Sequence, residues 1–271
     1  MEFRSPIPLD DPSAAASGSD VSPPPEDPVW SFFDVVLIAA FGFVVQAVFL
    51  ISAIQIAHSS GRFRGMRLSD LEKLTVLLVP VQVASYLMLI AFMVALLKLK
   101  YGVDNFLKAV RWNAPDLRTG MLAVAGGAGL GFFSAISSAL LDRWIPKSLP
   151  IHEYFRDASS AYTLAFLGIF VAPFVEELFF RGFLYPALAR KLGVAAAIIF
   201  TAAPFALLHE QQLAHAWIPL LLLFVIGSVL TFFRAKTKSL AIPVLMHAGY
   251  NSTLFVLLFI GTQGFRHMER V

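Results

Sequence analysis

The sequence predicts an all-α, polytopic transmembrane bundle of about seven helices, within a range of six to eight, with a polar site in its C-terminal half. Of the 271 residues, 58% are hydrophobic and only 14% are charged, and the mean hydropathy is +0.73. These values lie outside the usual composition of soluble domains. Long uncharged runs recur along the chain, and about 20 apolar residues suffice for a helix to cross the bilayer. We therefore expect a multi-pass protein of the cell membrane.

Residues 1–29 precede the first apolar run and are rich in Pro, Ser, Ala and Asp. Such a segment cannot bury enough apolar surface to become ordered, so we predict a disordered tail. It lacks the basic start and short apolar core of a secretory signal. The first apolar run is therefore expected to remain in the mature protein.

Three apolar runs in the first half are each long enough to span the membrane, and they assign residues 30–158 to an N-terminal domain. The runs cover residues 35–57, 74–97 and 119–141. Gln46 and Gln82, in the first two runs, are expected to make interhelical hydrogen bonds. The third run carries Gly127 and Gly131, a spacing that lets two helices approach closely.

The remaining spans form a second predicted domain, residues 159–265. We expect helices at residues 161–189, 194–211, 216–233 and 240–260. Basic residues after two of these helices, such as Arg190 and Lys238, mark one side of the membrane. The positive-inside rule makes that side cytoplasmic, and with seven spans the N-terminus is cytoplasmic too.

Composition excludes several classes of function. The chain has no cysteine, so it forms neither a disulfide framework nor a thiolate zinc site. Its net charge of +3 is small and its basic residues lie mostly in short loops, which argues against nucleic-acid binding and leaves membrane lipid as the expected surrounding. Polar residues crowd into the last 100 positions without a counterpart in the first half, which disfavours the inverted repeats of transporters.

An ionisable cluster interrupts the apolar run at residues 161–189. Side chains such as Glu176, Glu177 and Arg181 each cost about 2.5–3.5 kcal/mol inside hydrocarbon, so they indicate a functional site. Glu177 and Arg181 are four residues apart and share one helix face, where they can pair. Glu176 is rotated by about 100° from Glu177 and is left without that partner. Its carboxylate is therefore available for proton transfer.

Two histidines follow at helical spacing with a second residue one turn away. Phe205 precedes His209 by four residues, and Asn251 follows His247 by four. Glu176 and His209 both lie about 23 Å along their helices from the turn near residues 191–193, at about 1.5 Å per residue. Their depths in the membrane should match.

His247 and Asn251 lie about 14 and 20 Å from the turn near Lys238 by the same rise. This agreement is looser, and Pro243 is expected to delay the start of their helix. We predict that the four polar residues converge near the membrane midplane.

The three motifs together resemble those of the CPBP family of intramembrane proteases, which includes type II CAAX prenyl endopeptidases and bacteriocin-processing or self-immunity proteins. The motifs are Glu176-Glu177-x-x-x-Arg181, Phe205-x-x-x-His209 and His247-x-x-x-Asn251. The resemblance covers about residues 162–257. It implies an endopeptidase in which Glu176 and His209 activate a water molecule. It further implies that His247 and Asn251 bind the oxyanion.

The resemblance implies a membrane-embedded or membrane-adjacent peptide substrate, with a CAAX-type peptide among the candidates. Glu177, Arg181 and Phe205 are expected to be structural supports.

Other interpretations stay open. Glu176, His209 and His247 could instead be three zinc ligands with an open water position. Asn251 is a poor zinc ligand but a good oxyanion donor, so we favour a mechanism without a cofactor. A membrane immunity or scaffold protein that cuts nothing, and a proton or ion carrier, are alternatives of other classes.

Overall fold

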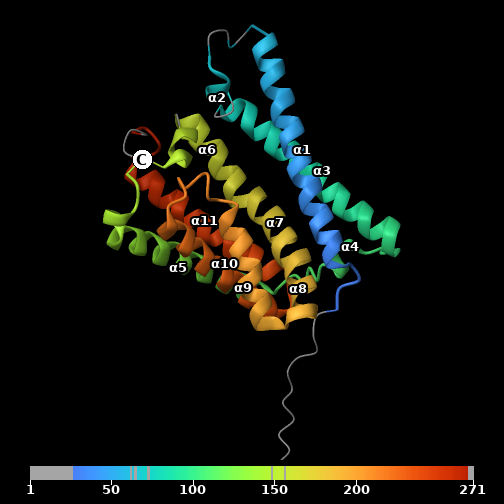
Figure 1. Ribbon diagram of the computed structural model, residues 1–271. Helices are drawn as coiled ribbons and strands as arrows, with labels where there is room; N and C mark the ends of the chain where they lie inside the picture. Colours follow the sequence, from blue (N-terminus) through green and yellow to red (C-terminus); the bar gives the residue numbers. More distant parts are fainter. Residues whose placement is uncertain are drawn as a thin grey trace, which may run out of the picture.

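The computed structural model describes residues 27–61, 63, 66–71, 74–147, 149–155 and 157–267. The described part of the chain is helical and contains no strand, which confirms the predicted fold class. The predicted disordered tail lies outside the described residues, except for its last three positions. Figure 1 shows α1 (Phe32–Ser59) and α3 (Thr75–Tyr101) next to a larger bundle formed by the described helices that follow residue 116.

Six helices of the described residues are long and apolar enough to cross a membrane. They are α1 (Phe32–Ser59), α3 (Thr75–Tyr101), α5 (Leu117–Leu140), the continuous helix Ala158–Leu192, α10 (Trp217–Thr237) and α11 (Ala241–Gly261). Short helical turns connect them: α2 (Leu68–Leu71), α4 (Phe106–Ala109), and the 3-10 turns Asp142–Trp144 and Pro150–Tyr154. The protein is therefore a multi-pass membrane protein.

The predicted span at residues 194–211 is shorter than expected. Its helix, α9 (Val194–Leu207), has 14 residues. This length corresponds to about 21 Å, which is short of a hydrocarbon core of about 30 Å. The chain leaves the helix in a series of turns, in which Ala214 and His215 adopt positive φ values of 53° and 55°. The helix ends just before the polar run at residues 209–212, so the predicted span extended too far into that run.

Three of the spanning helices begin at side-chain caps. Ser31 precedes α1, Asp116 precedes α5 and Asp157 precedes the long helix. Each of these side chains accepts a hydrogen bond from the backbone N–H three residues later. Such bonds satisfy a donor that the first turn of a helix leaves unpaired.

The long helix widens into a π-helical segment twice. It consists of α6 (Ala158–Phe166), the π-helical segment Leu167–Val171, α7 (Ala172–Glu177), a second π-helical segment Leu178–Leu184, and α8 (Tyr185–Leu192). A proline follows each π segment, at Pro173 and Pro186. Because proline lacks an N–H and its ring clashes with the carbonyl four residues earlier, a wider turn accommodates it without breaking the helix.

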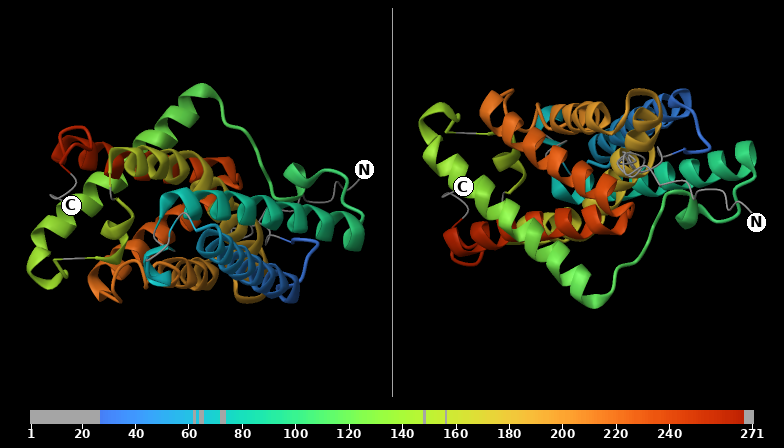
Figure 2. Two further views of the ribbon diagram at one scale, coloured as in Figure 1. Left: turned by 90° about the horizontal axis from the view of Figure 1, so that it is seen from above. Right: turned by 90° about the horizontal axis from the view of Figure 1, so that it is seen from below.

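Helix α5 packs in direct contact with α11, as Figure 2 shows from below. A Cβ atom built on Gly127 would lie 1.8 Å from the Met246 carbonyl oxygen, and one on Gly131 would lie 2.7 Å from Thr253 Cβ. The predicted close approach at these two glycines is therefore present. It fixes the position of α11 relative to the bundle.

Helices α1 and α3 form a pair that lies along the side of the bundle (Figures 1 and 2). At one end, Trp30 Nε1 donates a hydrogen bond of 3.0 Å to the Phe183 carbonyl, and Arg190 donates to the Pro28 carbonyl at 2.7 Å. Towards the other end, the hydroxyls of Thr75 and Ser160 lie 2.9 Å apart. Polar contacts thus attach the pair near both ends.

Candidate functional site

Glu177 is at the centre of the predicted ionisable cluster. It ends α7 and is fully buried, and its Oε1 atom lies 2.7 Å from Arg181 Nη1. Arg181 is also buried, and it donates to Thr231 Oγ1 at 3.1 Å and to the Gly227 carbonyl at 2.7 Å, both in α10. The structure therefore contains the ion pair that the spacing predicts. The contacts to α10 were not foreseen, because nothing in the local sequence indicates them.

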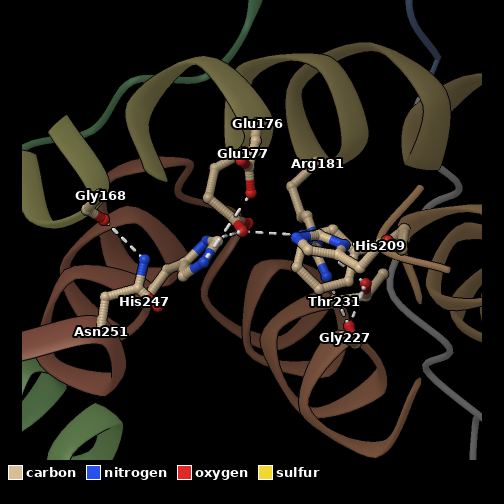
Figure 3. A network of polar contacts seen from close by, with 10 residues as sticks. Gly168, Glu176, Glu177, Arg181, His209, Gly227, Thr231, His247 and Asn251 are labelled. Carbon is tan, nitrogen blue, oxygen red and sulfur yellow. Dashed lines mark hydrogen bonds and ion pairs between the residues drawn. The ribbon is translucent and has the colours of Figure 1, made fainter. Parts of the chain in front are cut away.

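His247 contacts both glutamates from α11. Its Nδ1 atom lies 2.9 Å from Glu177 Oε1, and its Nε2 atom lies 3.9 Å from Glu176 Oε2. Figure 3 shows the Glu177 carboxylate between His247 on one side and Arg181 on the other. Since a carboxylate accepts, the Nδ1–H of His247 donates to it, and this leaves Nε2 facing Glu176. Sequence reasoning assigned Glu177 to Arg181 alone and missed this second contact.

His209 stands in the first turn after α9. Its Nδ1 atom is 3.0 Å from the Phe205 carbonyl oxygen. A carbonyl only accepts hydrogen bonds, so we assign the ring proton to Nδ1 in the neutral ring. Nε2 then keeps its lone pair and can accept a proton.

Phe205 joins the separate parts of the cluster. Its ring is 5.4 Å from the His209 ring and 5.7 Å from the His247 ring, measured between centroids. The Arg181 guanidinium lies over the Phe205 ring at 4.5 Å, within the range of a cation–π interaction. Gly227 makes room for Phe205, since a Cβ there would lie 2.9 Å from Phe205 Cδ1.

Asn251 already uses one of its two amide hydrogens. Its Nδ2 atom donates to the Gly168 carbonyl at 2.6 Å. Gly168 lies in the first π-helical segment, where the backbone hydrogen-bond pattern shifts from four to five residues. Asn251 therefore links α11 to that segment, and one N–H remains for another acceptor.

A cavity of about 330 Å³ lies between the α1–α3 pair and the bundle. Its lining includes Glu176 and His209, together with Gln46 and Gln82 from the N-terminal pair. Cavities that bind small ligands usually start at about 300 Å³. His247 does not line the cavity. Its Nε2 atom, however, is 3.9 Å from the carboxylate of Glu176, which does line it. The structure thus brings Glu176 and His209 to a common space, as their matched depth predicts.

The alternative zinc ligands, Glu176, His209 and His247, do not form a three-ligand group in the structure. Among the described residues, no group of three or more His, Cys, Asp or Glu side chains is placed to hold a metal ion. Glu176 and His247 are adjacent, but they form no three-ligand group with His209. We therefore derive no catalytic step through a metal.

Comparison with known proteins gives one match. Residues 158–253, about a third of the chain, match the family described as type II CAAX prenyl endopeptidase Rce1-like. No curated protein and no solved structure matched the chain. All three motifs lie inside the matched segment, so the match confirms the resemblance read from them. The segment that carries the site is thus similar to a family of proteases, the Rce1-like type II CAAX prenyl endopeptidases.

Proposed function

We propose that this protein is an intramembrane endopeptidase that hydrolyses a peptide bond in a membrane-embedded or membrane-adjacent substrate. The observation that carries the proposal is the shared cavity of Glu176 and His209, with the His247 imidazole 3.9 Å from the Glu176 carboxylate. Peptide hydrolysis needs a base for water and a donor for the oxyanion. The cluster supplies both kinds of group.

Glu176 and His209 act on the water. The carboxylate of Glu176 accepts a proton from a water molecule that the Nε2 lone pair of His209 also orients. The resulting hydroxide oxygen bonds to the substrate carbonyl carbon, and the carbonyl becomes an oxyanion. When the C–N bond breaks, the proton held by Glu176 passes to the leaving nitrogen, so the enzyme returns to its starting state.

His247 and Asn251 stabilise the oxyanion. Protonated His247 donates through Nε2, while its Nδ1–H stays bound to the Glu177 carboxylate at 2.9 Å. Asn251 donates its second amide hydrogen, since the first is bound to Gly168. Glu177 accepts hydrogen bonds from both Arg181 and His247, so its single negative charge is shared between these two groups in this step.

The decisive experiment uses purified protein in detergent with a library of quenched fluorescent peptides. Wild type, Glu176→Gln and Glu210→Gln are compared with and without a zinc chelator. Glu210 is a matched control because it lies in the turns after α9, 3.8 Å from His215, and does not line the cavity. We expect cleavage by wild type and Glu210→Gln that survives chelation, and none by Glu176→Gln.

The same experiment separates the alternatives. Cleavage that the chelator abolishes would favour the zinc-dependent version of the protease. Absence of cleavage in wild type would favour a membrane immunity or scaffold protein. The family name makes CAAX-type peptides, with and without a prenyl group, the first members of the library to examine.

The orientation follows from the basic residues. The protein lies in the cell membrane with the end that carries Arg190 in the cytoplasm, and the Arg190 bond to the Pro28 carbonyl puts the start of α1 at the same end. The chain has no cysteine, so single cysteines can be introduced directly. A membrane-impermeant maleimide should label Lys147→Cys in intact cells, and Lys191→Cys only after permeabilisation. The reverse pattern would overturn this orientation.

A further inference from the structure

The cavity has a second polar wall opposite the glutamate, and it comes from helices outside the segment that matches the protease family. Gln82, Ser85 and Tyr86 of α3 and Gln46 of α1 line the cavity together with Glu176. We call these four residues the N-terminal wall. The three residues of α3 are spaced by three and four positions, so they share one helix face. The side chains of Gln82 and Tyr86 also interact with each other.

Ser85 gives the clearest sign that this wall receives a ligand. The residue is only 5% exposed, and its Oγ atom has no hydrogen-bond partner in the described part of the chain. Six other hydroxyls in helices α6, α10 and α11 donate to the carbonyl four residues earlier: Thr163, Ser228, Thr231, Thr237, Ser252 and Thr253. Ser85 does not make this usual bond. A buried hydroxyl without a partner destabilises the protein unless a bound group pairs with it.

The charge of the cavity limits what that group can be. Among the described residues that line the cavity, Glu176 is the only acidic one, and none is Lys or Arg. Arg181 lies nearby in the sequence but is fully buried and bonded to Glu177 and α10. A carboxylate or phosphate in this cavity would therefore meet a like charge and no counterion. The occupant should be uncharged.

Amides and hydroxyls match one kind of uncharged occupant well. The glutamine side chains both donate and accept hydrogen bonds, as does the hydroxyl of Ser85. Peptide groups present the same two functions, one N–H and one C=O per residue. A lipid acyl chain would leave the buried Ser85 hydroxyl unpaired.

We propose that the N-terminal wall binds uncharged peptide groups of the substrate and holds them opposite Glu176 and His209. This inference rests on the proposed function. It adds which surface binds the substrate and that the bound part of the substrate is uncharged. Gln46, Gln82, Ser85 and Tyr86 are positioning residues and take no part in the proton transfers. The wall favours a substrate whose chain continues past the cleaved bond, because a chain end there would bring a carboxylate close to Glu176.

The first test compares Ser85→Ala with Thr201→Val. Thr201 is a matched control because its hydroxyl is also buried without a described partner, but it does not line the cavity. Loss of one neutral hydrogen bond weakens binding by about three- to tenfold. Ser85→Ala should therefore lower kcat/KM for a quenched peptide by about that factor, mainly by raising KM. Thr201→Val should match wild type. Equal effects of the two substitutions, or no effect of Ser85→Ala, would overturn the proposal.

Gln82→Met provides a second variant that keeps the side-chain length and removes only the amide. It should also raise KM and leave kcat nearly unchanged. Thermal unfolding and the monodisperse peak in size-exclusion chromatography identify the variants that fold as wild type does. A fall in kcat alone, in a folded variant, would contradict a positioning role.

The second test varies the charge of the substrate. Peptides are compared in which the cleaved bond is followed by one, two, three or six residues, each with a free acid or an amidated end. The amidated form should have the higher kcat/KM when one residue follows, and the ratio should fall towards one as the fragment lengthens. A preference for the free acid in the shortest peptides would overturn the inference about charge.

Binding separates this inference from the proposed function. A fluorescently labelled peptide is titrated against Glu176→Gln and against the double variant with Ser85→Ala. Weaker binding by the double variant would support the N-terminal wall as a peptide-binding surface. If wild type cleaves no peptide, only the proposed hydrolysis is overturned, and the binding result still stands. Equal binding by the two variants would overturn the wall.

Discussion

The imidazole of His247 lies 2.9 Å from the same oxygen of Glu177 that pairs with Arg181 at 2.7 Å. Glu177 is thus the common partner of a permanent cation on its own helix and a titratable ring on α11. The contact joins the carboxylate motif to the second histidine motif across 70 positions of sequence. It also fixes which ring nitrogen of His247 faces Glu176.

Glu177→Gln should destabilise the protein strongly. The substitution leaves the buried guanidinium of Arg181 without its counterion, and breaking a buried pair in this way costs about 3–5 kcal/mol. Arg181→Met should lower the free energy of unfolding by a similar amount, because it leaves the buried Glu177 carboxylate without its cation. Thermal unfolding of the single variants and of the double variant measures the coupling. The double variant should lose less than the two single losses combined, and simple additivity would contradict the ion pair.

Gly127→Ala should separate α5 from α11. The new Cβ would lie 1.8 Å from the Met246 carbonyl oxygen, so one helix must move. Overpacking of this kind costs about 1–3 kcal/mol. Because α11 carries His247 and Asn251, peptide cleavage should fall as well. Both quantities can be followed by thermal unfolding and the quenched-peptide assay.

Gly129→Ala is the matched control for that experiment. Gly129 lies on the same helix, and a Cβ built on it meets no atom of the described residues within 4 Å. This variant should unfold at or slightly above the wild-type temperature, since alanine favours a helix over glycine. Similar losses in both variants would show that the contact between α5 and α11 is not the cause.

Asn251→Ala should lower kcat more than it raises KM. Removal of one oxyanion donor typically costs about 10²–10³ in kcat. The loss of the 2.6 Å bond to Gly168 should lower the unfolding temperature, but only by the effect of one hydrogen bond, about 1 kcal/mol. Unchanged kcat with lowered stability would assign Asn251 to structure alone.

Asp116 should make a pH-dependent contribution to the start of α5. Hydrogen bonds from the backbone N–H and the hydroxyl of Thr119 hold the pKa of Asp116 below its usual range. A lowered pKa stabilises the folded protein above the pKa of the unfolded chain, and this contribution is lost as the pH falls through the folded value. Wild type and Asp116→Ala should therefore differ in unfolding temperature at pH 7 and converge in acid. The difference should be small, because the carboxylate is exposed to solvent.

Most of the fold could be predicted because it depends on local hydropathy. The run at residues 35–57, for example, became the helix Phe32–Ser59, which is longer because the polar cap residue Ser31 and the charged Asp34 carry no apolar signal. The span of α9 was predicted too long because it included the polar residues 209–211, which follow the last turn of the helix. Hydropathy indicates an apolar region, and it does not give the residue at which a helix stops.

Only those contacts of the site that follow from residue spacing within one helix could be predicted from the sequence. Four-residue spacing predicted the pairing of Glu177 with Arg181, but Arg181 lies in a π-helical segment where the usual rotation of about 100° per residue no longer holds. Contacts between helices, such as His247 with Glu177, depend on rotation and depth that helix counting gives only roughly. Tyr86 and Ser85 belong to no motif, so only the packing of α3 revealed their place beside Glu176.

The bonds from Trp30 to Phe183 and from Arg190 to Pro28 attach the N-terminal helix pair to the bundle at its border. The residues of the N-terminal wall and the three motifs thus lie in separate segments of the chain. If the proposed roles hold, substrate preference and hydrolytic chemistry can be changed independently. Grafting α1 and α3 from one homologue onto another would transfer the choice of peptide without rebuilding the reaction centre.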